Sequence, residues 1–193
     1  MIKTEQEEFW QGNFGDEYVD RNQSDLLLAS NTSFFSKVFN RTGKIDSIME
    51  FGCNIGMNLK AIRALLPESN LSGIEINKRA VDDLNKWEGK AHVIEGSILD
   101  IELDTRFDLT LIKGVLIHIN PERLDDVYTR LYNYSDKYIC IAEYYNPTPV
   151  AIPYRGYDNR LFKRDFAGEL MSKYSDLELV DYGFLYQNDP IFP

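Results

Sequence analysis

Histidine, cysteine and long apolar runs are all scarce in this chain of 193 residues. Its two cysteines, Cys53 and Cys140, are too few for a disulfide framework. Its two histidines, His92 and His118, offer too few ligands for a dedicated zinc site, so we expect no metal centre. No apolar run approaches the roughly 18–20 residues of a membrane span, so we expect no membrane segment.

Positive charge is also in short supply. The 21 lysines and arginines face 31 aspartates and glutamates, which gives a formal net charge of −10. A nucleic-acid backbone demands a basic protein face, so this balance argues against general binding to DNA or RNA. The N-terminal residues MIKTEQEEFW are too acidic and polar for a signal peptide. We therefore expect a cytoplasmic protein without a nucleic-acid or membrane partner, and the sequence leaves its oligomeric state open.

The chain is instead rich in alternating strand and helix patterns. Strand-like runs separated by helical periodicity are found at 44–51, 70–76, 91–96, 107–115 and 137–145. After an irregular segment, we expect a helix at 164–174 and a sixth strand at 177–186. This alternation predicts a Rossmann-like α/β fold, with a mainly parallel sheet covered by helices on both faces. Ligands of such sheets bind beyond the carboxyl ends of the strands.

We expect a single domain in three parts. Trp10, Phe14 and Tyr18 recur at four-residue spacing, which predicts a helix with one aromatic face. The parts are an N-terminal helical cap at 1–42, a cofactor-binding core at 43–146, and a substrate-facing segment at 147–193 that contains the last helix and strand.

A glycine loop, EFGCNIGMN at 50–58, follows the first predicted strand and opens a helix, as nucleotide-binding loops do. Gly52 would allow a sharp turn, and Gly56 would allow the helix to pack close to the strand. The dinucleotide fingerprint needs a further glycine where this chain has Asn54. Glu50 would also bring a carboxylate near a pyrophosphate, an unfavourable contact between like charges. Both features disfavour NAD.

The same acid suits a ligand with a positive end, and S-adenosylmethionine has an ammonium, a sulfonium and no phosphate. Glu75 lies 23 residues after Gly52, close to the usual spacing for an acid that binds ribose hydroxyls. Ser97 and Ile98 follow the third strand and would flank an adenine. We predict an S-adenosylmethionine site formed by Glu50, Gly52, Cys53, Asn54, Gly56, Asn58, Glu75, Ile76, Ser97, Ile98 and Lys113.

The arrangement resembles the class I S-adenosylmethionine-dependent methyltransferases. The segment FDLTLIKGVLIHINPERL, at 107–124, is similar to their fourth-strand segment, which often ends in a histidine followed by an apolar residue. TEQEEFWQGNFGDEYVDRN, at 4–22, and YRGYDNRLFKRDFAGEL, at 154–170, more narrowly resemble the methylases associated with pseudaminic acid biosynthesis. The likeness runs along nearly the whole chain and implies a Rossmann-like methyltransferase of bacterial surface-sugar assembly.

The resemblance also implies a lid and points to a missing strand. In the resembled family the N-terminal segment folds over the cofactor, which assigns Trp10, Tyr18, Arg21 and Asn22 to cofactor binding, with Arg21 available for its carboxylate. Members of the superfamily finish with a seventh, antiparallel strand. This chain stops at QNDPIFP, where that strand should begin, so we expect the final strand to be missing and the sheet edge to be open.

Two residues near the end of the fourth strand are candidates for catalysis: Lys113, in or just past the strand, and His118, which follows it. His118 lies near where the methyl group would point, and an ordinary histidine pKa of about 6.5 suits a base for a hydroxyl acceptor. A structural histidine at the helix that begins near Asn120 is the alternative. Lys113 either faces the cofactor end of the sheet or faces solvent.

A basic stretch, PYRGYDNRLFKR at 153–164, stands out in an acidic protein. Arginine forks pair well with carboxylates, and tyrosines often line sugar sites. We predict a small, anionic, sugar-derived acceptor such as a nonulosonic acid, bound by Tyr145, Tyr154, Arg155 and Arg160. A solvated loop is the alternative reading of this stretch. A noncatalytic cofactor-binding or partner module, and an NAD-dependent nucleotide-sugar oxidoreductase, are the alternative functions.

Overall fold

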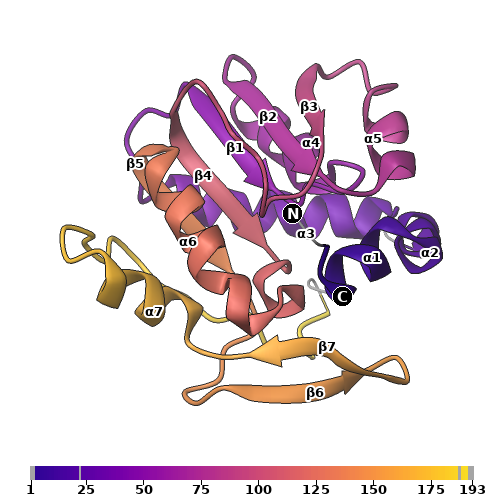
Figure 1. Cartoon of the computed structure of the whole chain (residues 1–193). Helices are drawn as coiled ribbons and strands as arrows, with labels where there is room; N and C mark the ends of the chain where they lie inside the picture. The colour runs from indigo at the N-terminus through magenta and orange to yellow at the C-terminus, as the bar shows by residue number, and fades with distance from the viewer. Residues whose placement is uncertain (1–2, 22, 187, 191–193) are drawn as a thin grey trace.

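The computed structural model of the chain describes residues 3–21, 23–186 and 188–190. Five strands form a parallel sheet in the order β3-β2-β1-β4-β5 (Figure 1). The strands are β1 (Ser47–Phe51), β2 (Asn70–Glu75), β3 (Ala91–Glu95), β4 (Phe107–Lys113) and β5 (Ser135–Ala142). The order reverses between β1 and β4, which creates the switch point where such sheets bind ligands. The predicted Rossmann-like α/β fold is confirmed.

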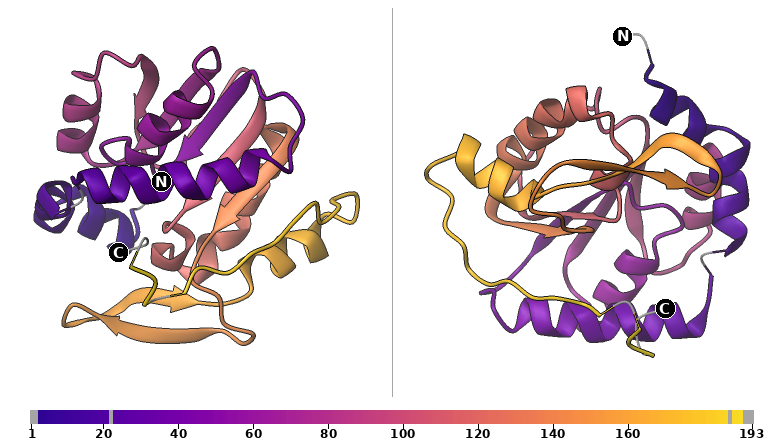
Figure 2. Two further views of the ribbon diagram at one scale, coloured as in Figure 1. Left: turned by 180° about the vertical axis from the view of Figure 1, so that it is seen from behind. Right: turned by 90° about the horizontal axis from the view of Figure 1, so that it is seen from below.

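Helices cover both faces of the sheet because alternate strand residues point to opposite sides. On one face, Ile48 and Leu111 pack in a core with residues of α3 (Asp25–Phe39), α4 (Met57–Leu65) and α5 (Lys78–Leu84). On the other face, their neighbours Met49 and Ile112 pack with residues of α6 (Leu124–Asn133) and α7 (Phe166–Lys173). The left view of Figure 2, which shows the molecule from behind, has α3 crossing in front of the sheet. No helix of the described ranges is long and apolar enough to cross a membrane.

The N-terminal cap consists of two short helices before α3. These are α1 (Glu5–Gln11) and α2 (Asn13–Arg21), which are separated at Gly12. Thr4 begins α1 with a capping box, in which its side chain accepts from the N–H of Glu7 while the Glu7 side chain accepts from the N–H of Thr4. Both helices lie beyond the carboxyl ends of the strands, on the side of the sheet where the switch point opens (Figure 1).

The stretch expected to be irregular before α7 is an antiparallel hairpin, and that expectation is wrong. Its strands are β6 (Val150–Tyr154) and β7 (Tyr157–Lys163), and they form a separate sheet. Arg155 and Gly156 both have positive φ, 48° and 86°, as a two-residue hairpin turn of matching twist requires. Pro153 has no N–H to donate, but it lies at a register shift of a two-stranded sheet, where the missing N–H costs little.

The sixth strand predicted at 177–186 is also wrong. This segment has no strand in the structure, and its large side chains are exposed, with Tyr182 86% and Phe184 83% accessible. Alternating apolar residues favour a strand only where a neighbouring strand supplies the hydrogen bonds. Within the described chain β5 is the edge of the sheet and no strand pairs with its outer side.

Candidate active site

The glycine loop after β1 adopts a backbone that only glycine accommodates at two positions. Gly52 and Gly56 have φ angles of 79° and 75°. A Cβ atom on Gly52 would lie 2.6 Å from Cγ2 of Val115, and one on Gly56 would lie 2.4 Å from Cδ1 of Leu84. The tight turn predicted at Gly52 is therefore present, and the close neighbour of Gly56 belongs to α5 rather than to a strand.

Glu75 ends β2 and ties two loops together. Its Oε2 accepts from the N–H of Asn54 at 2.8 Å, and its Oε1 accepts from the N–H of Asn77 at 2.8 Å. Burial raises the pKa of this carboxyl, and the N–H groups of Asn77, Asn54 and Ile76 oppose the rise. The acid predicted to hold ribose hydroxyls is thus fixed at the ligand end of the sheet, directly beside the glycine loop.

Glu50 is fully buried and only half satisfied. Its Oε1 accepts from Nδ2 of Asn58 at 2.6 Å. Glu50 Oε2 and Asn58 Oδ1 have no hydrogen-bond partner among the described residues. Burial raises the pKa of Glu50 to about 8, against the Asn58 hydrogen bond and the charge of Lys113. Two buried acceptors without donors fit an ammonium group, which is the chemistry that S-adenosylmethionine would bring to this end of the sheet.

Three other predicted cofactor residues contact different parts of the protein. Ser97 donates from its hydroxyl to Oε1 of Glu7 in the cap, so the loop after β3 is joined to α1. Ile98 is buried in the core that α6 and α7 share with the sheet. Cys53 is buried and burial raises its pKa well above the usual range, so its thiol contributes packing rather than reactivity.

The cap brings an aromatic cluster to the site. The Trp10 ring lies 4.7 Å from the ring of His118 and 5.1 Å from that of Tyr18, measured between centroids. The Arg21 guanidinium lies over the rings of Phe14 and Tyr18, at 5.2 and 5.9 Å. Asn22, also assigned to the lid, lies outside the described residues. Cofactor binding by these residues stays a prediction.

His118 is buried and held by the hairpin. Its Nδ1 lies 2.6 Å from the backbone oxygen of Arg160. A carbonyl oxygen only accepts, so Nδ1 carries the proton and Nε2 keeps a free lone pair. Burial lowers the pKa of His118 to about 4, so the ring is neutral at pH 7. The helix start is capped by the side chain of Asn120, which accepts from the N–H of Glu122 at 3.0 Å, and not by His118.

Lys113 lies near two buried acids, Glu50 and Glu143. Burial lowers its pKa, and the carboxyls of Glu50 and Glu143 oppose the change. Glu143 was not among the predicted site residues, although it directly follows β5 at the ligand end of the sheet, which is the signal that could have found it. Its Oε1 accepts from the N–H groups of Val115 and Leu116, at 2.8 and 2.9 Å. Burial raises the pKa of Glu143 to about 7.

The predicted acceptor residues separate into two groups. Tyr154 lies 5.0 Å from the His118 ring, and Arg160 pairs with Glu5 of α1 at 3.1 Å. Arg155 stands exposed at the hairpin turn, with its guanidinium over Tyr154. Tyr145 is 65% exposed. The structure thus brings Tyr154 and Arg160 to His118 and leaves Arg155 and Tyr145 at the periphery. No group of three potential metal ligands occurs in the ranges that the structure describes.

Comparisons with known proteins agree with the architecture. No family model matches the chain, and no curated protein matches it. Among solved structures, the plantazolicin methyltransferase BpumL in complex with SAH has a TM-score of 0.57 and 21% identity, over 72% of this chain and 57% of that one. The sugar N-methyltransferase KedS8 from a Streptoalloteichus species gives 0.57 and 14%, over 76% and 62%. Streptomyces venezuelae DesVI gives 0.56 and 14%, over 75% and 66%.

The chain shares the Rossmann-like α/β fold of these three proteins. It spans 57% of the length of BpumL and 62% of that of KedS8. At these identities the likeness concerns the fold, and the residues of the site have to carry any statement about chemistry.

Replacing Gly52 with alanine tests the glycine loop. We expect Gly52→Ala to lower the free energy of unfolding by roughly 1–3 kcal/mol, because the new Cβ meets Val115 in a left-handed backbone. Gly114→Ala shares the positive φ but has open space, so it isolates the backbone cost, and Gly96→Ala has neither problem. Urea unfolding of the three variants checks this, and equal midpoints for Gly52→Ala and Gly96→Ala would contradict it.

Replacing Glu50 with glutamine tests its burial as an ionisable group. The folded protein keeps a proton on Glu50 up to about pH 8, whereas the unfolded chain releases it near 4.5. Stability is therefore lost as the pH rises through this window. We expect Glu50→Gln to match the parent at pH 5 and to exceed it by roughly 2–4 kcal/mol at pH 8.5. The exposed Glu122→Gln is the control, and a pH-independent difference in urea unfolding would contradict the assignment.

Proposed function

We propose that the chain is an S-adenosylmethionine-dependent methyltransferase with a small, anionic, sugar-derived acceptor. The pair of unpartnered buried oxygens, Glu50 Oε2 and Asn58 Oδ1, carries this proposal. They lie at the carboxyl end of β1, where an ammonium group can donate to both and its positive charge favours the ionised form of Glu50. A pyrophosphate has no N–H to offer either oxygen. BpumL, with the same fold, is described in complex with SAH, which supports this choice of cofactor.

S-adenosylmethionine supplies an activated methyl group when bound, and the protein contributes chiefly alignment. Glu75 would hold the ribose hydroxyls, and Glu50 with Asn58 would hold the ammonium. His118 has its free lone pair on Nε2, because Nδ1 is committed to Arg160. With a pKa of about 4, this ring stays unprotonated at neutral pH and is a weak base. It suits orienting an acceptor hydroxyl and taking its proton as the methyl group transfers, rather than beforehand.

An acidic sugar acceptor, of the nonulosonic or pseudaminic acid kind, is supported by the basic hairpin and by the resemblance of the cap and hairpin sequences. KedS8, described as a sugar N-methyltransferase, supports a sugar as an acceptor class for this fold. The fold neutralises part of the basic stretch, since Arg160 pairs with Glu5 and Arg164 with Glu169 at 2.6 Å. Charge complementarity therefore rests on fewer cations than the sequence suggests.

A noncatalytic partner module has one observation in its favour. The segment 177–186 exposes Leu179, Val180, Tyr182 and Phe184, and the outer edge of β5 is open within the described chain. A partner on this edge would lie away from the carboxyl ends of the strands, so it is compatible with methyl transfer.

Calorimetry tests the cofactor. We expect binding of SAH and none of NAD or nucleotide sugars. Glu75→Ala should weaken SAH binding by about 1–3 kcal/mol, since charge-assisted hydrogen bonds to ribose are lost. It should also lower stability, because the N–H groups of Asn54 and Asn77 lose their acceptor. Glu95→Ala, which removes an exposed acid from the end of β3, is the control. Tight NAD binding without a response to SAH would overturn the proposal.

A further inference from the structure

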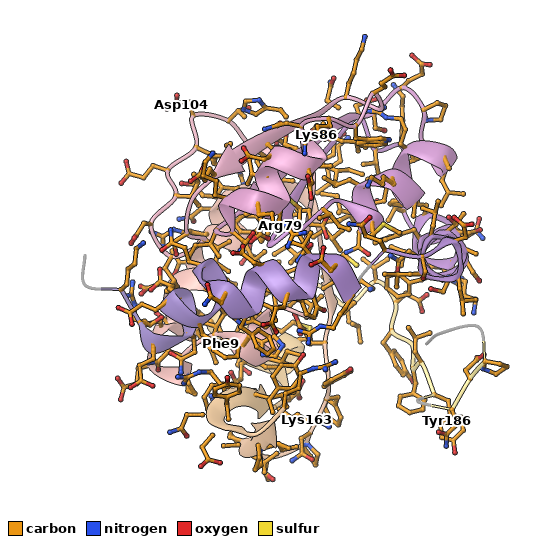
Figure 3. All side chains as sticks on the ribbon, turned by 90° about the vertical axis from the view of Figure 1, so that its right-hand side faces the viewer. Phe9, Arg79, Lys86, Asp104, Lys163 and Tyr186 are labelled. Carbon is orange, nitrogen blue, oxygen red and sulfur yellow. The ribbon has the colours of Figure 1, made fainter. Side chains whose placement is uncertain are left out.

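One face of α1 rests against the hairpin and the turn that carries His118. Gln6, Phe9 and Trp10 share this face, as residues three and four apart on a helix do. Gln6 donates from Nε2 to the backbone oxygen of Asn159 at 3.0 Å, and the Phe9 ring lies 5.1 Å from that of Tyr157. Figure 3 shows Phe9 above the hairpin, on which Lys163 is labelled. We call this contact region the cap–hairpin junction.

The junction holds three buried polar atoms that nothing satisfies. Gln6 Oε1, Trp10 Nε1 and Arg160 Nε have no hydrogen-bond partner within the described ranges. An unsatisfied buried polar group costs roughly 1–3 kcal/mol, so such groups call for an explanation. The other atoms of this kind, on Glu50, Asn58 and Glu143, belong to the ends of β1 and β5 and to α4, so this set forms a second, separate location.

The three atoms define the chemistry of a missing partner. Two are N–H donors, one of them on a guanidinium, and they require oxygen acceptors, of which a carboxylate forms the stronger, charge-assisted hydrogen bonds. The third, Gln6 Oε1, requires a donor such as a hydroxyl. A carboxylate with a neighbouring hydroxyl meets all three needs, whereas an ammonium would oppose Arg160 with its own positive charge.

Aromatic rings surround these atoms. Phe9 stacks on Phe14 at 4.1 Å, and Phe14 lies 5.9 Å from Tyr154 and 6.2 Å from Tyr157. Rings with polar edges suit the mixed apolar and hydroxylated faces of a sugar. Arg160 also gives its carbonyl to Nδ1 of His118, so one residue of β7 touches the candidate base and presents a donor to the junction.

We propose that the acceptor binds at the cap–hairpin junction, with its carboxylate on Trp10 Nε1 and Arg160 Nε and a hydroxyl on Gln6 Oε1. This inference rests on the proposed methyltransferase function and deepens it. It assigns Trp10 to acceptor recognition instead of cofactor binding, and it makes Gln6 a determinant of specificity for the acceptor. Because Trp10 lies against His118, α1 has to move for the acceptor to enter.

The indole N–H of Trp10 reports such binding directly. The chain has only two tryptophans, and Trp87 is half-buried against the core cluster that contains Ile48 and Leu111, so its indole resonance is an internal control. In ¹H–¹⁵N spectra of the full chain with saturating SAH, N-acetylneuraminic acid should move the Trp10 indole resonance downfield and leave that of Trp87 in place. The methyl ester of the same sugar and inorganic phosphate should leave both in place.

Two substitutions complete the test. Trp10→Phe keeps an aromatic ring and loses the N–H, and Arg160→Gln loses the guanidinium. Each should weaken binding of the sugar acid about tenfold or more, the equivalent of one hydrogen bond. SAH affinity should stay within about twofold, because neither change touches the ends of β1 and β2. A variant of unchanged thermal stability that binds the acid as the parent does would overturn the proposal.

Other outcomes separate the inference from the function it rests on. A Trp10 shift with SAH alone would return Trp10 to the cofactor and refute the proposal. Equal shifts with acid and ester would remove the carboxylate assignment, and a shift with phosphate would remove the sugar-acid assignment. A chain that binds SAH without any response to the acid would contradict this inference alone. A chain that fails to bind SAH would contradict the methyltransferase function.

Discussion

The carboxylate of Glu75 fixes the relative positions of the glycine loop and the start of α5, on which ligand binding at this end of the sheet would depend. One oxygen holds the glycine loop through Asn54, and the other holds Asn77 at the start of α5. Asn77 in turn accepts from the N–H of Ala80 and donates to Asp16 and to the backbone oxygen of Trp10. A single buried acid at the end of β2 thereby links the sheet, the glycine loop and the cap.

The same end of the sheet contains three buried ionisable groups. Glu50, Lys113 and Glu143 follow one another across β1, β4 and β5, and burial disfavours the charged form of each. Buried ionisable groups that lack full hydrogen bonding cost several kcal/mol and are retained where they serve a ligand. Glu50 and Glu143 each keep one oxygen without a hydrogen-bond partner among the described residues, which a ligand with N–H or O–H donors would satisfy.

The core was predictable because parallel strands buried on both faces appear as apolar runs, and the site residues follow their ends. This pattern predicted that Glu50, Gly52 and Glu75 lie at the carboxyl ends of β1 and β2, where the structure has them. The hairpin was not predicted because its turn, Arg155 followed by Gly156, lacks the usual Asn-Gly or Asp-Gly signal. The strand predicted at 177–186 failed because propensity cannot supply a partner strand. Glu143 was overlooked although it directly follows a predicted strand. Gln6 was invisible to local patterns, since its importance arises from a contact with the distant backbone of Asn159.

Two contacts between residues far apart in the sequence join the cap to the hairpin. Gln6 reaches Asn159 across 153 residues of sequence, and Glu5 pairs with Arg160 across a similar interval. The two stretches that carry the narrower sequence resemblance, at 4–22 and 154–170, are therefore in contact around His118. The right view of Figure 2 shows the hairpin and the two cap helices on the same side of the sheet. Binding of a cofactor that many enzymes share would require only the loops of the core. Recognition of one particular acceptor would require distinctive residues, and the two stretches that meet around His118 could supply them together.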